Sequence, residues 1–168
     1  MNMSEFQFIT SDRPLREVEN PFVSFLSIRE ALAHGIALPD MLLEDDTIDR
    51  DAKLLMHVED ESQLDEIEIK HDLSYEADNV EAYSNEPYVA ELRWRLSEAR
   101  ATQLIAYVEA QLEEATVVEL WKVWVDEVTE PIVHSISSAD LSPKALHFLG
   151  EVGFERPECL RIVKTKET

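Results

Sequence analysis

The residues from Pro87 to Leu96 alternate between apolar and mostly polar side chains, and this alternation constrains the fold more than any other feature of the sequence. The apolar set is Tyr88, Ala90, Leu92, Trp94 and Leu96, with Val89, Glu91, Arg93 and Arg95 between them. Because successive side chains of a strand point to opposite faces, the pattern predicts a strand with one face in a core. Ser97 is a helix N-cap residue, and apolar residues at helical spacing predict a helix from there to about Glu114 that packs on that face.

Two more strands, a second helix and a closing strand are predicted downstream. Residues 116–125 (TVVELWKVWV) and 132–137 are rich in β-branched and aromatic residues, which favours strands. Ser142 precedes Pro143 at the first position of the second helix, Gly150 ends it, and we expect it on the same side of the sheet as the first helix. The segment CLRIVK, which begins at Cys159, predicts the last strand.

Residues 87–165 therefore predict an α+β fold with the β-α-β-β-α-β order of the ferredoxin-like split unit. A different open α+β sheet with the same order of elements fits the pattern equally. Only one face of the strand at 116–125 can lie beneath the two helices, so the face that carries Trp121 is either covered by the first 86 residues or left as a partner surface. We expect cover by the chain's own first half.

The first 86 residues predict an N-terminal α/β extension of the same sheet. The segment 5–10 (EFQFIT) predicts a strand, and Ser27 with Glu30 forms a capping box that opens a short helix ending at Gly35. Further short strands are predicted at 53–58 and 66–71, with a loop over 72–86. We expect residues 1–168 to form a single α+β domain, made of an acidic extension (1–86) and a core (87–165).

Charge is distributed unevenly along the chain. The sequence holds 36 acidic against 15 basic residues, and the first 86 residues hold 22 of the acids and 6 of the bases. Phosphate backbones and anionic lipid surfaces repel such a chain, and no apolar stretch is long enough to cross a bilayer, so nucleic acid and membrane are excluded as expected partners. We instead expect a basic or mixed-charge protein partner, bound through Asp45, Asp46, Glu59, Asp60, Glu61 and Trp121.

No catalytic, cofactor or metal motif is present. The acidic run at 45–51 alternates carboxylates as a calcium loop does, but Arg50 stands where the loop needs glycine and Met56 where it needs glutamate. The five histidines lack zinc-ligand spacing, the only cysteine, Cys159, follows an acid that disfavours its thiolate, and three glycines cannot build a phosphate loop. We expect no cofactor and no enzymatic activity. The lone cysteine and the absence of a secretory start predict a cytoplasmic protein.

Three segments of the second half carry a resemblance to a known kind of protein. They are 119–124 (ELWKVW), 140–142 (DLS) before the second helix, and 157–162 (PECLRI) at the end. Together they resemble small bacterial immunity proteins found beside polymorphic toxins. The resemblance implies a non-enzymatic protein that occludes a toxin, and it assigns no functional residue. The sequence leaves open a small-molecule-binding regulatory domain, an enzyme whose site is assembled from dispersed residues, and a homodimer formed through a sheet edge or face.

Overall fold

A computed structural model describes residues 5–74, 78–125, 127–151 and 155–165. Contacts divide the chain into two compact units, which are described separately. We call Met1–Glu19 with Glu66–Thr168 the sheet unit, and Asn20–Asp65 the acidic unit. That residues 1–168 form a single α+β domain stays a prediction.

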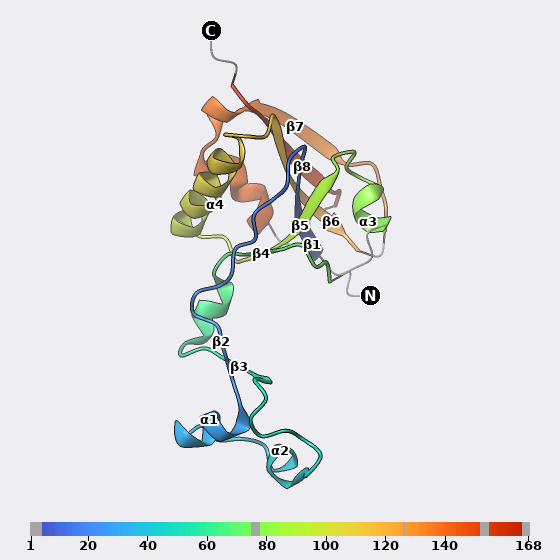
Figure 1. Ribbon diagram of the computed structural model, residues 1–168. Coiled ribbons are helices and arrows are strands. Elements are labelled where there is room, and N and C mark those ends of the chain that lie inside the picture. Colours follow the sequence, from blue (N-terminus) through green and yellow to red (C-terminus); the bar gives the residue numbers. More distant parts are fainter. Residues whose placement is uncertain (1–4, 75–77, 126, 152–154, 166–168) are drawn as a thin grey trace. The chain divides into compact units, whose positions relative to one another are not determined.

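The sheet unit is built on a six-stranded sheet with the order β4-β5-β1-β6-β8-β7. Its strands are β1 (Glu5–Ser11), β4 (Glu68–Lys70), β5 (Tyr88–Arg93), β6 (Val117–Trp124), β7 (Ile132–Ser137) and β8 (Glu158–Val163) (Figure 1). All neighbours are antiparallel except β7 and β8, which are parallel. The α+β class predicted from the sequence is confirmed, with a mostly antiparallel sheet.

The elements between residues 87 and 165 follow one another in the predicted order, but their pairing differs from the ferredoxin-like arrangement. Helix α4 (Glu98–Gln111) connects β5 to β6, and the 3-10 helices η2 (Ser138–Asp140) and η3 (Pro143–Gly150) lie between β7 and β8. In a ferredoxin-like unit the third of the four strands would separate the first two. Here β1 lies between β5 and β6, and β8 separates β6 from β7. The strand order therefore differs from the predicted ferredoxin-like order. The difference arises because β1, in which Phe6, Phe8 and Ile9 are all buried, is a central strand of the sheet.

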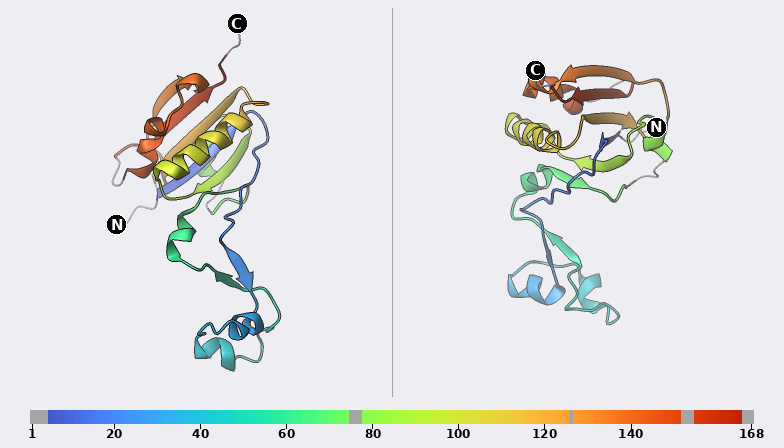
Figure 2. Two further views of the ribbon diagram at one scale, coloured as in Figure 1. Left: turned by 90° about the vertical axis from the view of Figure 1, so that its left-hand side faces the viewer. Right: turned by 45° about the horizontal axis from the view of Figure 1, so that its top comes forward.

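The two predicted helices cover the same face of the sheet, as expected. Ser97 caps α4 by accepting a hydrogen bond from the Arg100 backbone N–H at 3.2 Å. Leu104 of α4 and Leu146 of η3 share one apolar cluster with residues of the sheet such as Leu120. Figure 2 shows α4 lying across this face. The second helix is a 3-10 helix rather than an α-helix.

The opposite face of the sheet is covered by the chain's own first half. Phe8 and Trp121 stack with ring centroids 5.8 Å apart, and Tyr83 packs on Trp121 at 5.6 Å. Tyr83 and Val80 come from the segment predicted as a loop, which forms the short helix α3 (Asp78–Glu81). In Figure 1, α3 lies on the side of the sheet away from α4. Cover of this face by the first 86 residues was expected from the sequence.

A single lysine, Lys122, interrupts the apolar run of β6 on the face toward the helices. Its side chain is 1% exposed, and Nζ donates a hydrogen bond to the Phe148 carbonyl at 2.9 Å and a second to the Glu151 carbonyl. The last carbonyls of a helix have no partner within the helix. Lys122 therefore satisfies the end of η3 and fixes that helix to the sheet.

The acidic unit has short elements and is organised by one helix cap. It contains β2 (Ser24–Leu26), α1 (Ile28–Ala33), α2 (Asp40–Glu44), β3 (Leu55–His57) and the 3-10 helix η1 (Glu61–Asp65). The predicted capping box is present: Ser27 Oγ accepts from the Glu30 N–H at 3.1 Å, and Glu30 Oε1 accepts from the Ser27 N–H at 3.2 Å. Gly35 ends the helix region with a φ of 73°. The predicted strands at 53–58 and 66–71 are the shorter β3 and β4, whereas β2, α2 and η1 were not predicted.

We predict that Lys122→Met destabilises the chain by about 1–3 kcal/mol, because it removes the hydrogen bonds that the buried ammonium group donates to the Phe148 and Glu151 carbonyls. Urea unfolding followed by tryptophan fluorescence measures the change. Lys164→Met is the matched control: Lys164 is exposed, its Nζ donates a hydrogen bond to the Glu113 carbonyl at 3.2 Å, and we expect a loss below about 0.5 kcal/mol. Equal losses for the two variants would contradict the anchoring role of Lys122.

Candidate functional site

The acidic unit has almost no core of its own. Ile28 and Ala31, each 1% exposed, are its buried apolar side chains, joined by the buried polar residues Asn20 and Ser27. Both apolar residues belong to α1. A unit with so small a core leaves most of its apolar surface outside.

Exposed apolar side chains are concentrated in this unit. Among the described residues, seven of the eleven large hydrophobic side chains that are exposed belong to it: Phe22, Phe25, Leu32, Met41, Leu54, Met56 and Leu64. Single exposed hydrophobics are ordinary on a protein surface, whereas a concentration rimmed by polar residues marks an interaction site. Aromatic residues and methionine are also enriched in protein interfaces.

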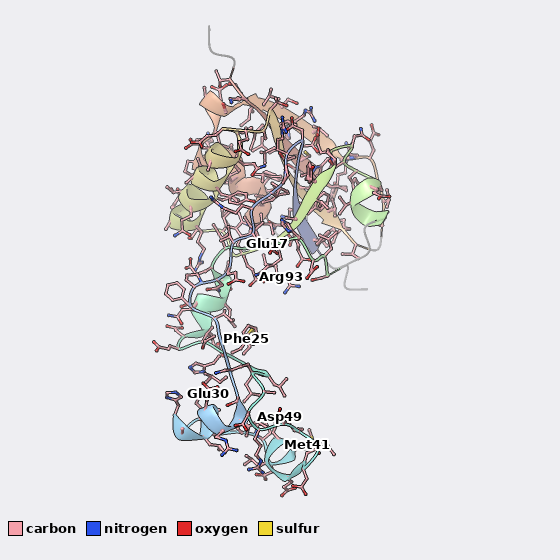
Figure 3. All side chains as sticks on the ribbon, in the orientation of Figure 1. Glu17, Phe25, Glu30, Met41, Asp49 and Arg93 are labelled. Carbon is pink, nitrogen blue, oxygen red and sulfur yellow. The ribbon has the colours of Figure 1, made fainter. Side chains whose placement is uncertain are left out.

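Phe25 and Met56 form the best-defined part of this surface. They lie directly opposite each other in the antiparallel pairing of β2 with β3, so their side chains project from the same face of the two-stranded sheet. Phe25 is 56% exposed and Met56 is 61% exposed. Figure 3 labels Phe25 on β2, together with Met41 in α2 of the same unit. We call these two residues the Phe25–Met56 pair.

The cations of the acidic unit are held within it. The unit carries eleven acidic and three basic residues. Arg29 Nε lies 2.8 Å from Asp51 Oδ1, Lys53 is paired with Glu30, and Arg50 donates a hydrogen bond to the Leu43 carbonyl at 2.9 Å. The remaining acids give this surface a negative charge that is not compensated within the unit.

All five acidic residues predicted to meet a partner lie exposed in the acidic unit. Asp45 and Asp46 follow α2, and Glu59, Asp60 and Glu61 come shortly after β3. Hydrogen bonds from the side chain and backbone of Thr47 lower the pKa of Asp45, which keeps its carboxylate ionised. The structure thus brings both acidic blocks into the unit that carries the Phe25–Met56 pair.

Trp121, the sixth predicted residue, lies elsewhere. It belongs to the sheet unit and is 2% exposed, stacked on Phe8. Phe25 and Met56, in contrast, are exposed apolar side chains that the sequence analysis did not single out. The available signal was the uncharged apolar run from Phe22 to Ile28, which is long for a segment that supplies only Ile28 to a core.

A buried carboxylate, Glu119, organises the polar groups beneath α3. Its Oε1 accepts hydrogen bonds from Thr10 Oγ1 at 2.8 Å, Ser84 Oγ at 2.6 Å and Trp121 Nε1 at 3.1 Å. Its Oε2 lies 2.7 Å from a guanidinium nitrogen of Arg161, which also reaches Glu86 at 3.4 Å. Burial alone would raise the pKa of Glu119, but these hydrogen bonds outweigh it and lower the pKa. All of these donors point to the Glu119 carboxylate. The cluster therefore holds the segment that contains Tyr83 and Ser84 against Trp121, and it does not offer a reactive group.

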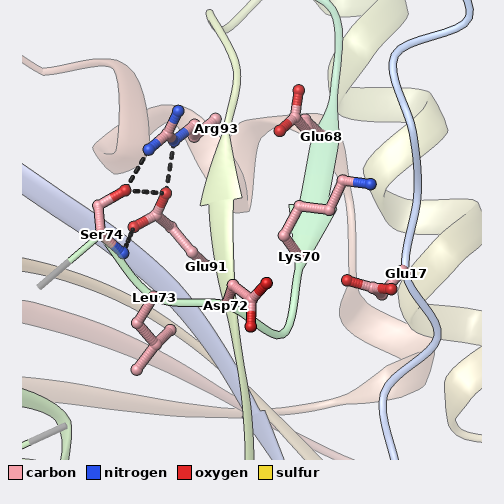
Figure 4. A pocket seen from close by; sticks show the side chains of 8 residues that line it. All are labelled: Glu17, Glu68, Lys70, Asp72, Leu73, Ser74, Glu91 and Arg93. Atoms are coloured by element: carbon pink, nitrogen blue, oxygen red, sulfur yellow. Dashed lines mark hydrogen bonds and ion pairs between the residues drawn. The ribbon is translucent and has the colours of Figure 1, made fainter. Parts of the chain in front are cut away.

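A hollow of about 500 Å³ lies beside β4 and β5 in the sheet unit (Figure 4). Three of its polar residues, Ser74, Glu91 and Arg93, are bound to one another. Glu91 accepts from the Ser74 N–H at 2.9 Å and from Ser74 Oγ at 3.0 Å, and it is paired with Arg93. Lys70 lies 3.0 Å from Glu19. The side chains of Ser74, Glu91 and Arg93 thus satisfy each other rather than pointing to a common ligand.

Other chemical candidates are weak in the part of the chain that the structure describes. Cys159 is free and buried, and burial, assisted by the charge of Glu119, raises the pKa of its thiol, which opposes a thiolate nucleophile. No group of three or more His, Cys, Asp or Glu side chains is placed to hold a metal ion in the described residues. Within the same residues, no helix combines the length and the apolar character needed to cross a membrane.

No family model, no curated protein and no solved structure matches this chain. Geometry and charge are therefore the guides to its function.

We predict that Glu119→Gln destabilises the chain by about 1–3 kcal/mol at neutral pH, because the amide presents a donor where the carboxylate accepts. The lowered pKa of Glu119 means that its charge stabilises the fold above the unfolded-state pKa, and that this contribution is lost as the pH falls through the folded-state pKa. The difference between wild type and variant should therefore shrink in acid. Urea unfolding from neutral to acidic pH measures it, with exposed Glu114→Gln as control. A difference that stays constant over that range would contradict this account.

Proposed function

We propose that this chain is a non-enzymatic binding protein whose acidic unit docks onto a basic or mixed-charge protein. The observation that carries the proposal is the Phe25–Met56 pair, an apolar surface more than half exposed in a unit whose three basic side chains already contact groups of the same unit. Exposed apolar surface rimmed by charge is what a protein interface needs before its partner arrives.

In the proposed mechanism, charge and apolar contact have separate tasks. The exposed acids of the acidic unit attract a basic surface over a distance of about 8 Å at physiological salt, which raises the rate of encounter. The Phe25–Met56 pair is then desolvated against the partner and holds the complex together. Rim charges mainly change association rates, whereas buried apolar anchors mainly change dissociation rates.

The partner that fits this chemistry best is a toxin with a basic surface. The resemblance of the second half to toxin immunity proteins supports this choice, and an inhibitor that occludes its target needs no active site of its own. An enzyme that acts on nucleic acid presents a basic surface to bind phosphates. An acidic protein covers such a surface by electrostatic complementarity. Neutralising an intracellular toxin would place this chain in the cytoplasm.

Neutralising the five predicted acids should slow binding without loosening the complex. The variant Asp45→Asn, Asp46→Asn, Glu59→Gln, Asp60→Asn, Glu61→Gln should reduce the association rate at low salt by about tenfold, weaken its salt dependence and leave the dissociation rate nearly unchanged. Surface plasmon resonance with the partner captured from the native cell measures both rates.

The matched control removes five exposed acids from the sheet unit: Glu109, Glu113, Glu114, Glu127 and Glu130, each changed to Gln. It reduces the net negative charge of the chain by the same amount. An association rate reduced equally by both sets would show that total charge alone, and not the acidic unit, attracts the partner.

Truncating the Phe25–Met56 pair should have the opposite kinetic signature. Phe25→Ser with Met56→Ser should raise the dissociation rate by about 10- to 100-fold and change the association rate little. Because both side chains are exposed in the free chain, the free energy of unfolding should change by less than about 0.5 kcal/mol. Tyr88→Ser with Val128→Ser, two exposed hydrophobics of the sheet unit, is the control. An unchanged dissociation rate for the Phe25 and Met56 variant would overturn the proposed anchor.

A further inference from the structure

The two edge strands of the six-stranded sheet differ in the pairing of their outward backbone groups. At one edge, β4 is only three residues long, and Ile69 exchanges two backbone hydrogen bonds with Val18, each of 2.9 Å. At the other edge, β7 is six residues long and pairs only with β8 within the described part of the chain. Edge strands with free backbone groups pair readily with other strands unless they are covered or protected. The first edge is capped, whereas the second is open.

The free backbone groups of β7 can be assigned from its ladder. Ile132 N–H donates a hydrogen bond to the Pro157 carbonyl at 2.8 Å, so Ile132 directs its backbone groups toward β8 in the parallel pairing. Alternate residues of a strand direct their backbone groups to opposite sides. Val133 and Ser135 therefore direct their N–H and C=O groups away from β8, and both residues are exposed. No hydrogen-bond partner for these groups lies among the described residues.

The sequence of β7 lacks the usual protection of an edge. The strand reads IVHSIS, with no Asp, Glu, Lys, Arg, Pro or Gly. Charged residues and prolines are the common devices that keep edges apart. Their absence is notable in a chain that is 30% charged. Next to the end of the strand, a hollow of about 470 Å³ leaves room for side chains of an added strand; it is lined by Ser135, Ile136, Ser137, Val163 and Thr165, with one acid and one base, Asp140 and Lys164.

We infer that β7 is a self-association edge, at which β7 of a second copy of this chain pairs antiparallel about a two-fold axis. Two-fold pairing sets uncharged residues opposite uncharged residues, so no acid faces an acid along the strand despite the net charge of −21. Antiparallel pairing also places the beginning of β7 of the second copy, with Ile132 and Val133, next to the hollow at the end of β7 of the first copy. A basic partner gains nothing from this uncharged strand, so a second copy is the occupant that fits it.

The association should be weak and should respond to salt in the opposite sense from partner binding. A contact through one strand is smaller than a standard interface, so we expect a Kd on the order of 10–100 µM. Two copies of so acidic a chain repel each other, and salt screens that repulsion. Dimerisation therefore strengthens as salt rises, whereas binding of a basic partner by the acidic unit weakens. This inference does not depend on the proposed function.

The test is sedimentation equilibrium of the full chain over a range of concentrations and salt. We expect the mass to rise from 19.3 kDa toward twice that value, with tighter association at about 0.5 M than at about 0.05 M salt. Ser135→Pro removes an outward N–H without touching the ladder to β8 and should weaken dimerisation at least about tenfold. Ser135→Ala, which keeps that N–H, should dimerise as the wild type does.

Val133→Lys is a second variant that keeps the backbone and adds a charge at the edge. It should also weaken dimerisation, and it keeps the test decisive if Ser135→Pro loses its circular dichroism spectrum. A chain that stays monomeric at all concentrations would overturn the inference. So would a dimer that both variants leave unchanged, or one that dissociates as salt rises.

Discussion

The antiparallel pairing of β1 with β5 on one side and β6 on the other is the interaction on which the sheet unit depends. It places the first strand of the chain in the middle of the sheet, so that Ile9 lies beneath α4 and η3 while Phe8 lies beneath α3. Each face of the sheet then carries a buried apolar cluster that other parts of the chain cover. Surfaces for other molecules are left at the sheet edges and on the acidic unit, and this division underlies both proposals.

The acidic unit is under a different constraint, because it must remain folded with very little apolar burial. A capping box, two ion pairs and side-chain hydrogen bonds in its turns supply local order in place of a core. Such interactions are individually worth little in water. The apolar side chains that a larger domain would bury stay outside, surrounded by acids. We interpret this arrangement as a surface that completes its burial only when a partner covers it.

Local signals in the sequence predicted the elements well, and long-range pairing was predicted poorly. The cap at Ser97, the capping box at Ser27 and the proline at 143 act within a few residues, and each opens a helix near the expected place. Strand order depends on contacts between distant segments, and the insertion of β1 between β5 and β6 left no local trace. Trp121 is a second example. The alternation of residues along its strand identified the face of the sheet on which it lies, but the sequence did not show that the segment containing α3 covers that face. The acidic blocks could be predicted as exposed charge from the sequence. The Phe25–Met56 pair could not be predicted, because it depends on the pairing of β2 with β3.

The central claim, that the acidic unit meets the partner, is tested most directly by crosslinking in the native cell. The photoreactive residue p-benzoylphenylalanine is placed at position 56 in the acidic unit or, as control, at the equally exposed position 128 in the sheet unit. Our account predicts a light-dependent adduct with one basic or mixed-charge protein from position 56 and none from position 128. Adducts of that protein from position 128 alone, or from both positions equally, would contradict it.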